Sequence, residues 1–500
     1  MSAARRLALI VGALLFFRLG SALIVSQPGY TDAYYYAGVA RRLVAGQGLT
    51  ADFIWNFLEA APGGAVPVPS HRFWMPLASV LQSIGIGAFP FVDSFHAAQA
   101  SEILASLFIP IVAYRAARSL GGTTDLSLVV AALAGLGGAF APGWVSLDAF
   151  APAAVLGTLF FLAYGRASRG DISSGAQAGL WIGLLFLARA EGALFGLALL
   201  PLLRSPVTRR AGAAGTAVAM AIGLAWVARD LSLGPVPDLV ARSALLVRYE
   251  DFFALEPPTW SAFVAALPQV LTAKVVAAGT NAATFMFAFG LMLVPGIVVA
   301  FRSRRMVPSV RAFAGLLISV YLFQSLVVTL HSTRGSYFHS LAAFFPFGVA
   351  LGIIATNELL RTAERRRVAA VAGLAAAFVL SAFALAEWDA AFGPPYRARV
   401  AAERSIPPGR LMAIDAAAWR WIGRRPVIVT PADLGPCAFA RASYSAAKWL
   451  VLEEQHFSAY DPIYRGLALP EYLGPAQVLG TFRIYPIDLR RAQTLCESGR

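Results

Sequence analysis

The chain has little charge and few cysteines for its length. Only 14% of its 500 residues are charged, whereas a soluble globular chain has about 25%. Because 58% of the residues are hydrophobic, this composition excludes an ordinary soluble globular protein. The 2 cysteines, Cys437 and Cys496, are too few for a disulfide scaffold or a cysteine-based metal site. They could form one disulfide outside the cytoplasm, but the sequence alone establishes no contact between them.

The apolar residues lie in blocks whose length suits a membrane. A helix needs about 20 mainly apolar residues to cross the hydrocarbon core of a bilayer. Such blocks are found at residues 7–26, 95–114, 126–142, 149–165, 175–188, 191–203, 211–228, 279–301, 312–330, 340–356 and 368–387. The first block lacks a small-residue cleavage pattern at its end, so we expect it to be a retained helix. The sequence therefore predicts a polytopic α-helical membrane protein with about eleven transmembrane helices.

The basic residues indicate an orientation. The formal net charge is +14, and arginine clusters fall in every second gap between apolar blocks. These clusters are Arg5/Arg6, Arg115/Arg118, Arg166/Arg169, Arg204/Arg209/Arg210, Arg302/Arg304/Arg305 and Arg361/Arg365/Arg366/Arg367. The positive-inside rule then places the N-terminus in the cytoplasm and the tail outside it. Because topology accounts for the basic excess, we do not expect a nucleic-acid partner.

The stretch 175–203 allows two interpretations, because Arg189 and Glu191 lie in its middle. A single long helix would place both charges at mid-bilayer, which is costly, and would reverse the sidedness of every later basic cluster. Two short helices that turn at Arg189 keep all the clusters on one side. We therefore predict two short spans that meet at an external turn.

We expect two domains. Residues 1–389 form the transmembrane domain, whose first external loop, 27–94, contains interfacial helices within the apolar stretch 76–91. Residues 390–500 are richer in proline, tyrosine and charge and are predicted to form a small external α/β domain. The expected strands are Leu411–Asp415, Val427–Thr430, Trp449–Glu453 and Thr481–Ile487, and the expected helix is Ala416–Gly423.

Two acids are candidates for chemistry at the outer membrane face. Asp32 follows the first span among tyrosines, where a carboxylate can act as general base on an incoming hydroxyl or amine. Asp148 lies in the next short external turn, at the start of a span. The two acids could divide base and orienting roles, or share a divalent metal such as Mg or Mn. The alternative for each is an N-cap, since aspartate is a preferred capping residue, with Asp32 capping a helix that begins at Ala33.

Further candidates could bind a phosphate or a sugar. His71 and Arg72 lie beside aromatic residues late in the first loop, and Arg189 and Glu191 lie at the predicted turn. Arg334 and Tyr337 lie in a further external turn, in the segment His331–His339. Arginine forms bidentate pairs with phosphate, although a surface arginine, or an Arg189–Glu191 structural pair, is the alternative.

Several motifs, in this order, resemble the GT-C superfamily of integral-membrane glycosyltransferases, in particular its bacterial protein-mannosyltransferase and aminoarabinose-transferase-like branch. The resemblance covers most of the chain but departs from the family pattern at Ala33, Ala188, Ala190 and Asp230. The motifs are Asp32 with Tyr35 and Gly46-x-Gly48, Trp74-Met75-Pro76-Leu77, Leu187-Ala188-Arg189-Ala190-Glu191-Gly192, Trp226-x-x-Arg229-Asp230 with Gly234-Pro235, and Leu411 through Val427.

The resemblance implies transfer of a sugar from a polyprenyl-phosphate donor to a protein, lipid or cell-wall glycan. It implies that Asp32 is the catalytic base and Asp148 the second external acid. It also implies a multi-pass protein of the bacterial inner membrane with a periplasmic C-terminal domain. The competing hypotheses are a transporter or flippase of lipid-linked sugars and a catalytically inactive relative. No internal repeat of the kind common in transporters is visible, and the candidate residues cluster at one predicted face.

Overall fold

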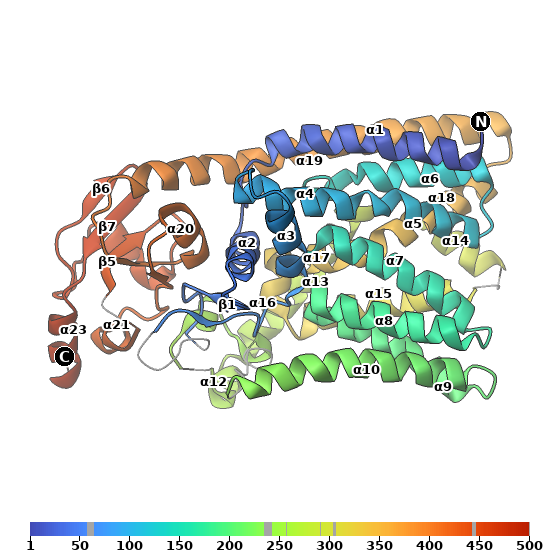
Figure 1. The fold of residues 1–500 in the computed structure, drawn as a ribbon. Helices are drawn as coiled ribbons and strands as arrows, with labels where there is room; N and C mark the ends of the chain where they lie inside the picture. Colours follow the sequence, from blue (N-terminus) through green and yellow to red (C-terminus); the bar gives the residue numbers. More distant parts are fainter. Residues whose placement is uncertain are drawn as a thin grey trace. The chain divides into compact units, whose positions relative to one another are not determined.

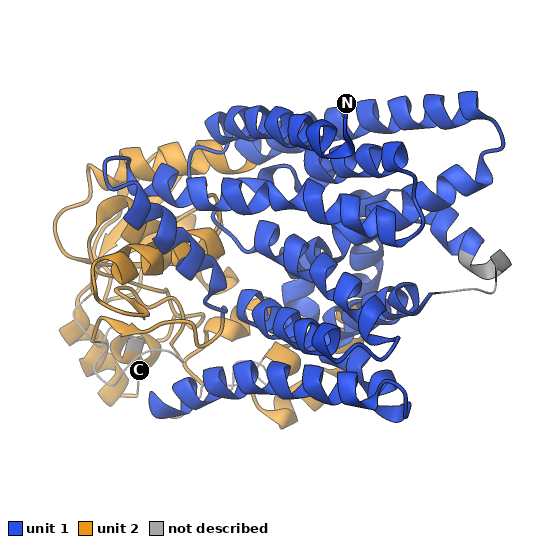
Figure 2. Cartoon of the chain, turned by 45° about the vertical axis from the view of Figure 1, so that its right-hand side comes forward, with its two compact units in different colours: residues 1–28, 74–234, 274–390 blue, residues 29–73, 235–273, 391–500 orange. Residues whose placement is uncertain are grey.

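The computed structural model describes residues 1–57, 65–234, 243–256, 258–290, 292–303, 307–442 and 447–499. Two residues of a predicted basic cluster, Arg304 and Arg305, lie outside the described residues. So does Pro235 of the Gly234-Pro235 motif. The chain forms two compact units (Figure 2). Unit 1 contains Met1–Pro28, Trp74–Gly234 and Lys274–Ala390, and unit 2 contains Gly29–Phe73, Pro235–Ala273 and Ala391–Arg500.

Unit 1 is a bundle of apolar helices (Figure 1). Its helices are α1 (Ala3–Ile24), α3 (Leu77–Ala88), α4 (Ser94–Ser106), α5 (Phe108–Ser119), α6 (Thr124–Leu136), α7 (Phe150–Ala167), α8 (Ile172–Ala188), α9 (Leu199–Arg204), α10 (Arg209–Ser232), α14 (Val294–Ser303), α15 (Pro308–Leu326), α16 (Thr329–His331), α17 (Tyr337–Leu341) and α18 (Phe345–Leu359). Two further helices, α13 (Leu267–Phe289) and α19 (Ala363–Glu403), run from one unit into the other along the chain.

Eight helical stretches among the described residues are long and apolar enough to cross a membrane. Helices α4 and α5 together form one of these stretches, and α16 to α18 form another. Shorter apolar helices, α3, α6 and α8, accompany them. The prediction of a polytopic helical membrane protein is confirmed.

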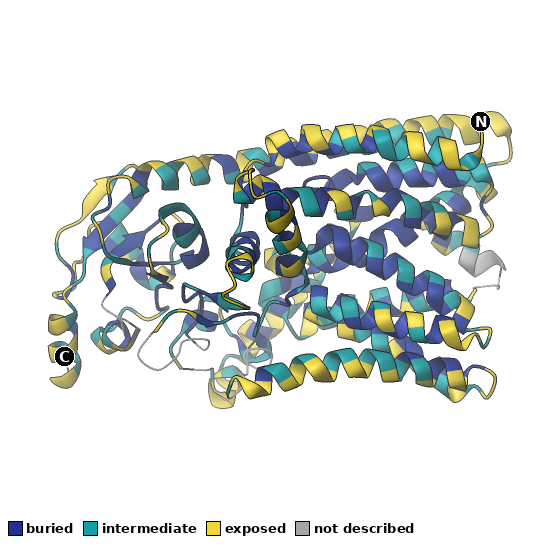
Figure 3. Ribbon diagram, in the orientation of Figure 1, coloured by how far each residue is buried: buried dark blue, intermediate teal, exposed yellow. Residues whose placement is uncertain are grey.

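The burial of the helices suits a lipid environment. In the most apolar 18-residue stretch of α1 and of α10, only 17% of the residues are buried, whereas 72% are buried in that of α7. Figure 3 shows the same contrast between outer and inner helices. Apolar side chains such as Phe16, Leu23 and Leu224 are therefore exposed on the outer helices. Exposed apolar surface of this extent is disfavoured in water but is expected where lipid covers it.

Two predictions about individual helices have different outcomes. The turn at Arg189 is confirmed, because α8 ends at Ala188 and Arg189 adopts an extended conformation before a 3-10 helix, Ala190–Ala198. The single span at 279–301 is wrong. The chain forms α13 and α14 instead, and Gly290, with a φ of +57°, follows the end of α13. Helix α13 also begins at Leu267, because less apolar residues extend it beyond the apolar block.

Unit 2 contains a five-stranded mixed sheet with strand order β4-β3-β5-β7-β6. Strand β3 pairs in parallel with β4 and β5, whereas β7 pairs antiparallel with β5 and β6. The strands are β3 (Arg410–Ala413), β4 (Val427–Ile428), β5 (Ala447–Leu452), β6 (Gln477–Leu479) and β7 (Phe482–Pro486). The helices of this unit are α2 (Thr31–Val44), α12 (Trp260–Ala265), α20 (Ala416–Gly423), α21 (Pro436–Ala442), α22 (Asp461–Tyr464) and α23 (Leu489–Glu497).

The small α/β region predicted in the tail is confirmed, and α20 has the predicted bounds. Strand β6 was not predicted, because three residues give too short a pattern. Residues 29–73 of the first loop also belong to unit 2, whereas the rest of that loop, with α3, belongs to unit 1. Strands β1 (Thr50–Ala51) and β2 (Val68–Pro69) form an antiparallel pair, and the Ile54 N–H donates to the Val427 carbonyl at 3.1 Å. The loop 29–73 thus belongs to the same compact unit as the tail. The predicted division into domains 1–389 and 390–500 stays a prediction.

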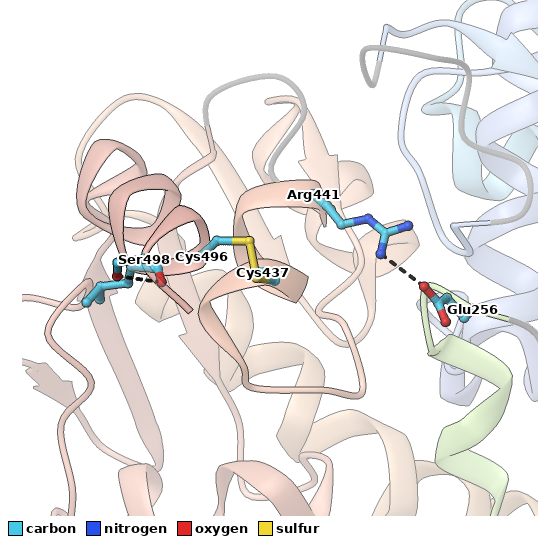
Figure 4. The surroundings of a disulfide bond; sticks show 6 residues. Glu256, Cys437, Arg441, Cys496 and Ser498 are labelled. Carbon is cyan, nitrogen blue, oxygen red and sulfur yellow. Dashed lines mark hydrogen bonds and ion pairs between the residues drawn. A yellow bond between two sulfur atoms is a disulfide. The ribbon is translucent and has the colours of Figure 1, made fainter. Parts of the chain in front are cut away.

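Two links stabilise unit 2 beyond its sheet. Arg399 pairs with Asp415 at 3.2 Å and with Glu453 at 2.8 Å, and so joins the last turns of α19 to the sheet. A disulfide between Cys437 and Cys496 joins α21 to α23 (Figure 4). The pairing that the sequence left open is therefore present in the structure.

Candidate functional site

The first part of the candidate site in unit 1 is a carboxylate–imidazole pair. Asp148 is fully buried in the turn that precedes α7, and its Oδ1 accepts a hydrogen bond from the Ala149 N–H at 2.5 Å. Its Oδ2 lies 3.2 Å from Nδ1 of His339. Ala149, not Asp148, occupies the N-cap position of α7, so the predicted capping role of Asp148 is not found.

Arg189 connects this pair to a second carboxylate. Its Nη1 lies 3.0 Å from Nδ1 of His339, and its Nε donates to Oε1 of Glu191 at 2.6 Å. The Ser340 hydroxyl donates to the same oxygen of Glu191 at 2.6 Å. Whether His339 accepts from Arg189 or donates to Asp148 depends on whether Nδ1 carries a proton. The cluster therefore joins two carboxylates through one guanidinium and one imidazole.

The local backbone explains how these side chains meet. Gly192 allows the 3-10 helix to fold closely against α8, since a Cβ there would lie 2.5 Å from the Leu185 carbonyl. Across the bundle, Arg334 and Gly335 have non-helical dihedral angles, and Gly335 has a φ of +108°. His339 and Ser340 lie in α17, about one helical turn after this break. The His339 ring is there in contact with Arg189.

Other side chains hold the cluster in place. The Gln324 side chain on α15 donates to the hydroxyls of Ser336 and Ser340 at 3.2 and 3.0 Å. The Phe150 ring lies 4.2 Å from the His339 ring, measured between centroids. Such supporting contacts restrict the rotamers of His339 and Ser340, which favours a fixed geometry.

The electrostatics of the cluster favour an ionised Asp148. Burial by itself would raise its pKa, but His339 and then Arg189 outweigh this effect, so the pKa of Asp148 lies below its ordinary value. At neutral pH the buried carboxylate is therefore charged and compensated by its neighbours.

In unit 2, Asp32 lies in the first turn of α2, which begins at Thr31 after the N-cap residue Tyr30. The expectation of a helix beginning at Ala33 with Asp32 as its cap is therefore wrong. An acid in the first turn interacts favourably with the helix dipole. Asp32 is partly exposed, whereas Tyr34 and Tyr36 in the same helix are buried.

The remaining candidates differ in exposure. His71 is fully buried in unit 2, with its ring stacked on Tyr36 and its backbone N–H donating to the Tyr35 hydroxyl at 2.7 Å. Its φ of +63° lies in the left-handed region, which is uncommon for a residue other than glycine. Arg72 is partly exposed. The role of His71 and Arg72 in binding a donor stays a prediction.

Of the candidates in unit 1, the structure brings together Asp148, Arg189 and Glu191. Tyr337 is buried with its ring 5.8 Å from that of Tyr321, and Arg334 is exposed at the break before α17. Sequence reasoning missed His339, Ser336, Ser340 and Gln324. Only the position of His339 in the same predicted turn as Arg334 could have indicated it.

The donor groups of each unit bear on the predicted divalent metal. In unit 1, Asp148 and His339 offer one carboxylate and one imidazole, but the Arg189 guanidinium lies beside the same ring nitrogen. Imidazole suits Zn better than it suits Mg or Mn, which prefer oxygen ligands. Asp32 belongs to unit 2. A shared ion between Asp32 and Asp148 therefore stays a prediction.

Comparison with solved structures shows the class of this fold, although no protein-family model and no curated protein sequence matches the chain. ArnT from Cupriavidus metallidurans bound to undecaprenyl phosphate is 15% identical, with a TM-score of 0.56 over 97% of this chain and 98% of that chain. The oligosaccharyltransferase AglB from Archaeoglobus fulgidus, in complex with an inhibitory peptide and a dolichol-phosphate, is 14% identical, with a TM-score of 0.51 over 96% of this chain and 77% of that chain.

A further structure of the Archaeoglobus fulgidus oligosaccharyltransferase, in complex with Zn and sulfate, has a TM-score of 0.51 at 15% identity. It covers 94% of this chain and 72% of that chain. The chain thus shares the fold of ArnT and of the archaeal oligosaccharyltransferase. At these identities the likeness shows the fold alone.

Proposed function

We propose that this protein transfers a sugar from a polyprenyl-phosphate donor to an acceptor at the outer face of the membrane. The observation that carries the proposal is the fold shared over 97% of the chain with ArnT, solved with undecaprenyl phosphate bound. The candidate acids and arginines agree with this chemistry, because glycosyl transfer from a phosphate requires a base for the acceptor and cations for the leaving group.

Asp32 is the general base in this proposal. It removes the proton of the acceptor hydroxyl or amine as that atom attacks the anomeric carbon. The bond between the anomeric carbon and the phosphate oxygen breaks, and polyprenyl phosphate leaves with the electron pair. A partly exposed carboxylate in the first turn of α2 suits this role, since an acceptor must reach it.

The unit 1 cluster has a positioning role in the same proposal. Arg189 already contacts Glu191 and His339, so its donors are committed to orienting the cluster around Asp148. Arg334, exposed at the break before α17, and Arg72 in unit 2 are the better candidates for binding the donor phosphate. Asp148 is the second acid, and it orients a substrate group or helps to hold a divalent ion.

In this proposal the acceptor is a protein, a lipid or a cell-wall glycan. A transfer assay would identify both the donor sugar and the class of acceptor. Purified protein in proteoliposomes would be offered radiolabelled polyprenyl-phosphate sugars together with extracts of each acceptor class. We expect transfer from one donor, with release of polyprenyl phosphate. If labelled lipid crosses the bilayer and no sugar is transferred, the protein is a flippase and not a glycosyltransferase. Donor binding with neither transfer nor crossing would indicate an inactive relative.

A further inference from the structure

The first turn of α2, which carries Asp32, packs against residues of the tail within unit 2. The ring of Tyr30, the N-cap residue of α2, lies 5.6 Å from the ring of Phe392, measured between centroids. One turn further along, the ring of Tyr34 lies 6.4 Å from the ring of Trp421, which belongs to α20. Aromatic rings that precede and follow Asp32 in the sequence therefore contact the tail.

A polar contact joins the same turn to the tail. Thr31 is the first residue of α2, and its hydroxyl donates to the Asp415 carboxylate. Asp415 follows strand β3 and is the N-cap residue of α20, where its Oδ1 accepts a hydrogen bond from the Ala418 N–H at 3.3 Å. One buried carboxylate therefore contacts the beginnings of two helices, α2 and α20.

The charges around Asp415 explain why it needs further hydrogen-bond donors. Arg399 lies 3.2 Å from Asp415 and 2.8 Å from Glu453, so one guanidinium compensates two carboxylates. The side chains of these acids are only 11% and 10% exposed, so water contributes little. The pKa of Asp415 lies above its ordinary value, mainly because burial disfavours the charged form. The Thr31 hydroxyl stabilises the ionised form of Asp415, as the Trp419 indole does for Glu453 at 2.8 Å.

A purely structural explanation covers only part of this arrangement. Arg399 joins α19 to the sheet whether or not residue 31 has a hydroxyl. The first turn of a helix lacks intrahelical acceptors for its N–H groups and frays readily. Tyr30 provides no side-chain cap for α2. The bond between Thr31 and Asp415 therefore restrains a turn that has no cap of its own, one residue before Asp32.

We propose that Thr31 and Asp415 are positioning residues for Asp32, so that the tail fixes the place of the proposed base. The catalytic part of this inference rests on the proposed function. A general base must lie within hydrogen-bond reach of the proton that it removes, and a displacement of about 1 Å can reduce the rate about 10²-fold. Loss of the Thr31 hydroxyl should therefore reduce kcat. It should leave the KM for the donor nearly unchanged, because Asp32 accepts a proton and does not bind the donor phosphate.

The test compares Thr31→Val, which keeps the shape of the side chain without its hydroxyl, with Thr31→Ser, which keeps the hydroxyl. In proteoliposomes, Thr31→Val should reduce kcat about 10- to 100-fold and change the KM for the donor by less than about threefold. Thr31→Ser should restore most of the activity. Thr124→Val is the matched control, because Thr124 is likewise the first residue of a helix, α6, but belongs to unit 1. It should transfer sugar like the wild type.

Hydrogen exchange gives a second readout, which does not require sugar transfer. The first helical hydrogen bonds of α2 begin at the Tyr34 N–H, which donates to the Tyr30 carbonyl at 3.2 Å. The amides from Tyr34 to Ala37 should exchange about tenfold faster in Thr31→Val than in the wild type, because a hydrogen bond to a buried charge is lost. In Thr31→Ser they should exchange at the wild-type rate.

Equal exchange of α2 in Thr31→Val and in the wild type would overturn the proposal. Faster exchange with an unchanged kcat would also overturn it, and so would a loss of activity that Thr31→Ser shares. If the wild type transfers no sugar, the proposed function fails. Faster exchange in Thr31→Val would in that case still show that the contact with Asp415 restrains the first turn of α2.

Discussion

At the scale of residues, Arg189 is the centre of the unit 1 cluster. Its guanidinium contacts Glu191 and His339, and His339 in turn contacts Asp148. The side chains of Arg189 and Glu191 are each 13% exposed, so neither charge is well hydrated. Removing one partner of such a pair leaves the other charge buried and uncompensated, which costs more than the pair contributes. The arrangement therefore makes a testable prediction about stability.

Arg189→Gln should reduce the free energy of unfolding by about 3–5 kcal/mol, because Glu191 then lacks its cation. Adding Glu191→Gln to this variant should recover part of the loss, with a coupling energy of about 1–3 kcal/mol. SDS titration in mixed micelles measures both quantities. Arg169→Gln is the control, since Arg169 is exposed on the same unit and should change stability little. Strictly additive effects of the two substitutions would contradict the coupling.

At the scale of elements, α8 and α10 approach each other closely through glycines. A Cβ at Gly179 would lie 2.0 Å from the Gly215 carbonyl oxygen, and one at Gly175 would lie 2.1 Å from the Ala211 carbonyl oxygen. Gly175, Gly179 and Gly183 recur every four residues along α8, so they share one face of the helix. Small residues at this spacing allow helix backbones to pack closely in a membrane, where the hydrophobic effect does not drive helix association.

Gly179→Ala should therefore force the two helices apart and reduce the free energy of unfolding by about 1–3 kcal/mol. Gly223→Ala on α10 is the matched control, because nothing lies within 4 Å of a Cβ at that position. It should leave stability unchanged or raise it by about 0.4–1 kcal/mol, since alanine restricts the unfolded chain more than glycine does. Equal effects of the two substitutions, measured by the same titration, would show that the close contact between α8 and α10 does not contribute to stability.

At the scale of the whole molecule, the arginine distribution and the disulfide bear on orientation. The positive-inside rule predicts that the tail lies outside the cytoplasm. Disulfides persist in oxidising compartments and are rare in the cytosol, and the Cys437–Cys496 bond joins the two helices α21 and α23 of that tail. The orientation stays a prediction, and the disulfide offers a way to test it.

In membranes from expressing cells that are treated with maleimide without a reductant, neither cysteine should be labelled, because the disulfide protects both. Protection should disappear after reduction, and the reduced tail should lose about 4 kcal/mol of stability, because the bond closes a loop of 59 residues. Cys437→Ser should free Cys496 for labelling and serves as the control. Labelling of both cysteines in the unreduced wild type would show that the disulfide is absent and would remove its support for an external tail.

Much of the fold could be predicted from the sequence because apolar blocks and charges act locally. The turn at Arg189 follows from the cost of charges at mid-bilayer, and the bounds of α20 follow from its amphipathic pattern. The break after Phe289 could not be predicted, because hydropathy continues across it. The contact between Asp148 and His339 joins residues 191 positions apart, and nothing local in the sequence indicates it.

The most direct test of the proposed function is sugar transfer by Asp32→Asn in proteoliposomes, with the donor that the wild type uses. Asn keeps the size of the side chain but cannot accept a proton, so transfer should fall by about 10²–10⁴-fold while binding of the donor lipid is retained. Asp125→Asn is the control, since Asp125 is exposed on unit 1 and pairs only at the surface with Arg6. Transfer within about threefold of the wild type by correctly folded Asp32→Asn would remove Asp32 from the role of base and contradict the proposed mechanism.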